Sequence, residues 1–159
     1  MNPTELIKLA DKINLNSKEN YYLRVAFGIA CIERVRHLLV KDSIIKALNV
    51  GNRYLIGEAD EDELSSAAKF VAMEASSHEG TNSIDGSGSA AVSTSRGVAA
   101  ALSGMALKAA EYAAYASVYS YAAYAVTDLK AYEEEHRWQI NKLKDIAINR
   151  GLLNEQGLI

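Results

Sequence analysis

The stretch from Ala90 to Ala125 constrains the fold of this chain more than any other part of its sequence. Alanine occupies 14 of its 36 positions. Its second half carries five tyrosines: Tyr112, Tyr115, Tyr119, Tyr121 and Tyr124. Alanine loses no side-chain entropy in a helix, so the stretch is predicted to be helical. Small side chains also let neighbouring helices approach closely, while tyrosines fill the wider gaps. We therefore predict an all-α fold, a compact bundle with a close-packed, alanine-rich centre.

The rest of the chain contains start and stop signals for a bundle of about six to seven helices. Asn2 and Pro3 are predicted to open the first helix, Ser17 to cap the second and Asp42 to cap the third. Glycine is expected to stop helices at Gly57, near Ser103-Gly104 and at Gly151. The predicted helices end near Ile13, Val40, Ile56, His78, Ser103, Thr127 and Asn149. No alternating strand pattern and no fixed-period repeat is present.

Three of the predicted helices show where their buried faces should lie. The second helix is apolar on several sides, which predicts a central position. Its apolar residues are Val25, Phe27, Ile29, Ala30, Cys31, Ile32, Val35, Leu38 and Leu39. The fourth helix has apolar residues at helical spacing: Leu64, Ala67, Ala68, Val71, Ala72 and Ala75. The last helix carries Tyr132, Ile140, Leu143 and Ala147 on one face.

Length and charge narrow the class of protein. The chain has 159 residues, which favours one domain over residues 1–159. Its net charge of −3 is too small to dictate a partner by itself. Residues 1–57 carry nine Lys/Arg and five Asp/Glu, whereas residues 58–159 carry eight and fifteen. This acidic bias argues against a nucleic-acid partner. Cys31 is the single cysteine, and we find no apolar segment long enough to span a membrane. We expect a cytoplasmic protein without membrane contact.

Two polar segments are the candidate partner-binding sites. The first is an acidic run with five carboxylates: Glu58, Asp60, Glu61, Asp62 and Glu63. These carboxylates either favour the positive end of the next helix or offer a patch to a basic partner. The second is the loop from Glu79 to Gly88, where glycine and small polar residues dominate. Its candidate contact residues are Glu79, Asn82 and Asp85.

Glutamate and histidine occur at helical spacing in three places. The pairs are Glu33–His37, Glu74–His78 and Glu133–His136. Only the last has the Glu-x-x-His spacing of di-iron bundles, and such a site needs a second Glu-x-x-His that the sequence lacks. A metal-dependent helical-bundle enzyme would use Glu33, Glu74, Glu133 and His136. We instead expect pairs on helix surfaces, with no catalytic residue, no metal and no cofactor.

Three stretches of the chain together resemble a known family. They are Arg24–Val35 (RVAFGIACIERV), Ile45–Glu58 (IKALNVGNRYLIGE) and Tyr121–Leu143 (YAAYAVTDLKAYEEEHRWQINKL). They resemble the all-helical immunity proteins that are encoded beside bacterial polymorphic toxins. The family elements match Cys31, Glu33, Arg34 and Val35, then Ala47 through Gly57-Glu58, then Trp138, Gln139 and Leu143. Family members often carry an acidic residue where this chain has Ala30, and histidines in the alanine-rich helices, where this chain has none.

The resemblance implies a non-catalytic protein that binds and neutralises a cognate toxin made by the same cell. A rigid bundle would present the contact surface, and the acidic run and the loop would supply specificity. A homodimer is left open as an additional assembly. The alternatives are the metal-dependent enzyme and a helical adaptor without a toxin partner.

Overall fold

The computed structural model describes residues 3–76, 86–121 and 129–154. These residues contain seven α-helices and no strand, which confirms the predicted all-α class. The α-helices are α1 (Thr4–Lys12), α2 (Tyr21–Glu33), α3 (Asp42–Leu55), α4 (Glu61–Ser76), α5 (Gly86–Leu102), α6 (Ala106–Tyr121) and α7 (Leu129–Asn149). Two short 3-10 helices, η1 (Lys18–Asn20) and η2 (Arg36–Leu38), flank α2. None of the described helices is both long and apolar enough to cross a bilayer.

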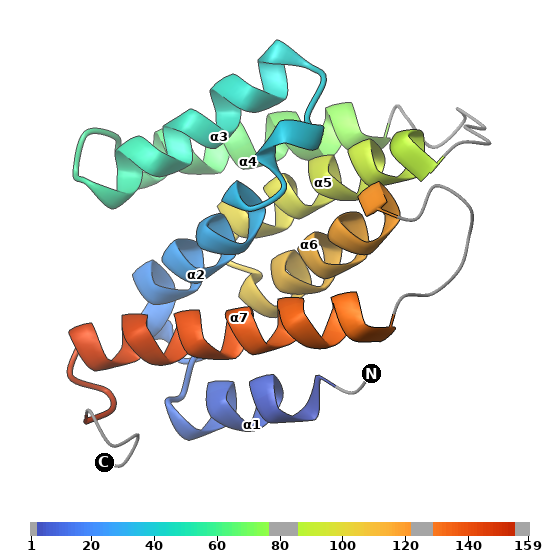
Figure 1. The fold of residues 1–159 in the computed structure, drawn as a ribbon. Helices are drawn as coiled ribbons and strands as arrows, with labels where there is room; N and C mark the ends of the chain where they lie inside the picture. Colours follow the sequence, from blue (N-terminus) through green and yellow to red (C-terminus); the bar gives the residue numbers. More distant parts are fainter. Residues whose placement is uncertain (1–2, 77–85, 122–128, 155–159) are drawn as a thin grey trace.

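Three helices form the centre of the bundle, and two pairs of helices cover it (Figure 1). The central helices α2, α5 and α6 all pack against one another. On one side, α4 packs on α5 and α3 packs on α4. On the other side, α7 packs on α6 and α2, and α1 packs on α7. The helix α2 also contacts α3, so the central position predicted for it is confirmed.

The centre is close-packed because the helix surfaces that meet there carry glycine and alanine. A Cβ atom on Gly28 of α2 would lie 3.1 Å from both Cα and Cβ of Ala101 on α5. The same atom would lie 3.4 Å from Cβ of Ala109 on α6. The buried alanines of the described stretch are Ala90, Ala100, Ala101, Ala106, Ala109, Ala110, Ala113, Ala114 and Ala116. The predicted alanine-rich centre is therefore confirmed.

The second predicted helix is shorter than its apolar pattern indicated. The prediction ran from a cap at Ser17 to Val40, but α2 begins at Tyr21 and ends at Glu33. After Glu33 the backbone tightens, and the N–H of Val35 donates to the carbonyl of Ile32 at 2.9 Å. This turn buries Val35 and Leu39 and returns the chain to α3, which a straight helix could not do.

Smaller corrections concern helix ends and one face. Neither Ser17 nor Asp42 makes a side-chain cap bond, and Asp42 is the first residue of α3. The predicted loop to Gly88 ends earlier, because α5 begins at Gly86. Ala72 is exposed, since a position about 80° around the helix from Leu64 lies at the edge of the buried face. The predicted end at Thr127 and the cap at Asn2 lie outside the described residues.

The predicted break near Ser103-Gly104 is confirmed as the turn between α5 and α6. Gly104 has a φ of +74°, a left-handed conformation that glycine adopts without steric cost. The guanidinium of Arg24 fastens this turn, donating from Nε to the Gly104 carbonyl at 3.1 Å. The same side chain donates from Nη1 to the carbonyl of Leu15 at 2.9 Å. The predicted stops at Gly57 and Gly151 also follow α3 and α7, with φ values of +79° and +73°.

Candidate functional site

The acidic run lies where the chain passes from α3 into α4. Asp60 accepts the backbone N–H of Glu63 at 2.8 Å through its Oδ1 atom, which caps the first turn of α4. Arg53 donates to the carbonyl of Glu58 at 2.9 Å and to Glu63 Oε2 at 3.5 Å. Acidic residues therefore occupy the first turn of α4, at the positive end of the helix dipole. This agrees with the first of the two interpretations given for the acidic run, that its carboxylates favour the start of a helix. All five carboxylates nevertheless remain exposed.

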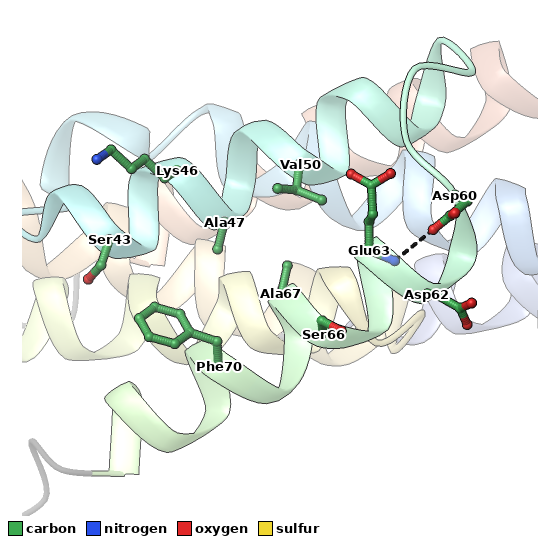
Figure 2. Close-up of a pocket in the computed structure, with 10 residues that line it drawn as sticks. All are labelled: Ser43, Lys46, Ala47, Val50, Asp60, Asp62, Glu63, Ser66, Ala67 and Phe70. Atoms are coloured by element: carbon green, nitrogen blue, oxygen red, sulfur yellow. Dashed lines mark hydrogen bonds between the residues drawn. The ribbon is translucent and has the colours of Figure 1, made fainter.

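A groove of about 580 Å³ separates α3 from α4 beside this acidic run (Figure 2). Its lining residues are Ser43, Lys46, Ala47 and Val50 from α3, and Asp60, Asp62, Glu63, Ser66, Ala67 and Phe70 from α4 and the residue before it. Figure 2 shows the three carboxylates gathered at one end of the groove and Phe70 toward the other. The small side chains of Ala47 and Ala67 face each other between these ends. The groove therefore has an acidic end and an end where the Phe70 ring lies on the same side as Ser43 and Lys46.

Exposed apolar side chains are concentrated on the same part of the chain. Among the described residues, four of the seven large apolar side chains that are exposed lie between positions 40 and 73. They are Val40 (80 % exposed), Ile56 (69 %), Phe70 (42 %) and Met73 (73 %). Of these four, Phe70 lines the groove, and exposed apolar surface beside polar groups is typical of protein-binding sites. This feature was not anticipated from the sequence, which pointed only to the carboxylates.

The other predicted contact residues are not placed by the structure. Glu79, Asn82 and Asp85 fall in the segment 77–85, outside the described residues. The prediction that this loop contacts a partner stays a prediction. Of the eight predicted site residues, the structure brings together Asp60 and Glu63, with Asp62 beside them at the groove.

The four residues of the alternative metal site do not come together. Glu33 accepts hydrogen bonds from Arg36 at 3.0 Å and Asn52 at 2.9 Å. Glu74 pairs with Lys41 at 3.2 Å, and Glu133 is exposed on α7. Within the part of the chain that the structure describes, no three His, Cys, Asp or Glu side chains are grouped as metal ligands would be. The surface position expected for His136 is also wrong, because its side chain is only 9 % exposed.

An ion pair between an exposed arginine and a buried glutamate joins the end of α2 to α7. Arg34 donates from Nε to both oxygens of Glu135, at 2.9 and 3.1 Å, and from Nη2 to Oε2 at 2.8 Å. The guanidinium also lies 4.2 Å from the ring centre of Trp138. Burial raises the pKa of the neighbouring Cys31 thiol, and Glu135 acts in the same direction. Three residues of the family resemblance, Cys31, Arg34 and Trp138, thus belong to a packed contact between helices.

A second pocket, of about 470 Å³, lies between α1, α6 and α7. It reaches His136 and Gln139, two buried polar residues of α7. Gln139 donates from Nε2 to the carbonyl of Ala110 at 2.9 Å. His136 Nδ1 and Gln139 Oε1 have no hydrogen-bond partner among the described residues. Sequence reasoning did not single out this pair as a site. The sequence does contain one signal for the burial of Gln139. Glu135, Gln139 and Leu143 are spaced four residues apart, which places Gln139 on the same helix face as the apolar Leu143.

We expect the free energy of unfolding to fall when the pH drops below 6.5, partly because of His136. Burial lowers the pKa of His136 from its usual 6.5, while Glu135 and the nearby Gln139 act in the opposite direction. Below pH 6.5 the unfolded chain therefore binds a proton that the folded chain resists, until the lowered folded pKa is passed. Urea unfolding of the wild type and of His136→Gln, at about one pH unit above and one pH unit below 6.5, measures this effect.

The expected result is a smaller loss of stability on acidification in His136→Gln than in the wild type. His37→Gln is the matched control, because His37 is exposed and its replacement should leave the wild-type loss intact. Lys108 and Glu111 on α6 also line the pocket, and both variants retain them. Equal losses in His136→Gln and the wild type would contradict the assignment to His136.

Comparison with known proteins gives no match to a family model, a curated protein or a solved structure. The family resemblance noted from the sequence therefore stays a prediction.

Proposed function

We propose that this protein is an immunity protein, which binds a toxin made by the same cell and neutralises it without catalysis. The observation that carries the proposal is the groove between α3 and α4, with its acidic end and its exposed Phe70 (Figure 2). The resemblance of the three sequence stretches to immunity proteins supports the identity of the partner.

The packing of the bundle supports a binding role. An inhibitor that is already rigid loses little conformational entropy when it meets its partner. Here α3 and α4 pack against each other, and α4 rests on α5, one of the three central helices. The buried contacts of Leu64, Val71 and Ala75 hold α4 against its neighbours. The two helices that form the groove are therefore held in place by packing against the rest of the bundle.

The chemistry of the groove defines the partner segment that it fits. Asp60, Asp62 and Glu63 at one end complement lysine or arginine side chains. Phe70 at the other end offers apolar contact to an aliphatic or aromatic side chain. We infer that the toxin docks a basic segment that also carries an apolar anchor. Attraction between opposite charges would raise the association rate, and salt would weaken it.

Replacing Asp60, Glu61 and Asp62 together with their amides should slow association with the toxin. The variant removes three negative charges that would steer a basic partner, so the salt dependence of the rate should also flatten. The fold should survive, because asparagine at position 60 can still cap α4. Stopped-flow or surface-based association rates at low and high salt measure the effect.

A triple variant on the opposite side of the bundle is the matched control. Glu133, Glu134 and Asp145 are exposed on α7, and changing them to amides removes the same net charge. This control should associate faster than the groove variant at low salt. Equal rates in the two variants would show that only net charge matters and that the groove carries no specific contact.

Co-expression tests the function itself. Cells that express the toxin encoded beside this protein should survive when the wild-type protein is present. Binding without protection would favour the helical adaptor, and failure to bind and to protect would remove the immunity proposal.

A further inference from the structure

The pocket between α1, α6 and α7 is lined by both exposed and buried apolar residues. Ile7 and Tyr115, at 44 % and 38 % exposed, belong to the open side. Leu6 and Ala114, at 3 % and 2 % exposed, belong to the buried side. A volume of about 470 Å³ falls within the usual range of small-molecule sites. The walls therefore suit a compact apolar ligand.

The buried end of the pocket is polar and incompletely paired. Gln139 is fully buried, and its amide N–H₂ donates to the Ala110 carbonyl. That bond leaves Oε1, which can only accept, as the unpaired atom. His136 Nδ1 is the second unpaired atom. The Gln139 side chain is near His136 without meeting hydrogen-bond geometry. Leaving such atoms unpaired in a protein interior costs about 1–3 kcal/mol each, so their presence needs an explanation.

The charged residues at this pocket do not select a charged ligand. Lys108 and Glu111 both line it, and their side chains lie 3.8 Å apart as an ion pair. Their charges cancel at close range. The ring of Tyr132 lies nearly parallel to that of His136, at an interplanar angle of 17°. Aromatic side chains such as these can stack with a planar ring of a ligand.

We propose that this pocket binds a small, uncharged, planar aromatic molecule that carries an N–H donor for Gln139 Oε1. The binding of a ligand here goes beyond the proposed function and does not depend on it, because the groove between α3 and α4 lies on the other side of the bundle (Figure 1). A ligand of this kind satisfies the buried acceptor and covers the apolar walls at the same time. A pocket that holds water alone would satisfy the acceptor but leave the apolar walls wet.

Two probes of the same shape test the proposal with the full-length protein. Indole presents an N–H donor where benzofuran presents an oxygen acceptor. Titration calorimetry should show indole binding to one site, about threefold to tenfold more tightly than benzofuran, the value of one added hydrogen bond. In Gln139→Met, which keeps the side-chain volume but removes the acceptor, the two probes should bind equally. Glu133→Gln, exposed on the same helix, is the control and should keep the preference.

Three results would overturn the proposal: no binding of indole, equal affinity of the two probes for the wild type, or a preference for indole that survives in Gln139→Met. If Gln139→Met does not fold, the comparison of the two probes on the wild type decides alone. None of these results bears on protection against a toxin, so this proposal and the proposed function fail independently.

Discussion

Replacing Arg34 with methionine is expected to lower the free energy of unfolding by about 2–3 kcal/mol. The change leaves the Glu135 carboxylate, whose side chain is only 4 % exposed, without its bidentate partner. Removing one member of a fully buried pair costs roughly 3–5 kcal/mol. We expect a smaller loss here because the Arg34 side chain is 39 % exposed and water partly screens the pair. Urea unfolding of the variant measures the loss.

Two further variants show whether the loss of stability comes from the unpaired Glu135 carboxylate or from removing an arginine side chain as such. In Arg34→Met/Glu135→Met no unpaired carboxylate remains, so most of the stability should return. Arg36→Met is the matched control, because Arg36 pairs with Glu33 at 3.0 Å and both side chains are 35 % exposed. That variant should lose only about 0–1 kcal/mol. Equal losses in Arg34→Met and Arg36→Met would mean that the pair with Glu135 does not stabilise the fold.

Replacing Ala113 and Ala116 with leucine is expected to overpack the centre of the bundle. Both alanines are fully buried on α6, which packs against α2, α5 and α7. Added methylene groups in a well-packed core cost about 1–3 kcal/mol per site, so the double variant should lose more than either single one. Thermal unfolding is the measurement.

Ala72→Leu is the control for this experiment. Ala72 also lies within a helix, but its side chain is exposed, so the same substitution should change stability by no more than about 0.5 kcal/mol. An unchanged unfolding midpoint in the Ala113 and Ala116 variants would contradict the close packing around α6 that the full burial of both alanines indicates.

Local chemistry made several parts of the fold predictable. Alanine predicted the central helices α5 and α6, and glycine predicted the stops at Gly57, Gly104 and Gly151. The carboxylates after Gly57 predicted the start of a helix, which is α4. These features depend on propensities and on contacts within one turn, so neighbouring residues contain the necessary information.

The tertiary structure decided where α2 ends and which polar residues are buried. The pattern through Leu39 is helical in the sequence, yet α2 ends at Glu33, and Val35 and Leu39 are buried in the core beyond the turn that follows. Glu135 lies 101 residues from its partner Arg34, so no local pattern could show that one glutamate of three is buried.

The two candidate sites also differ in how much of each could be predicted from the sequence. The acidic run at residues 58–63 is visible in the sequence, because charge is a property of the residues themselves. The groove beside it exists only because α3 and α4 pack side by side through small residues, Ala47 and Ala67. The second pocket requires α1, α6 and α7 to meet around His136 and Gln139. Propensity and charge act between neighbours along the chain, whereas a cavity is shaped by side chains that only folding brings together.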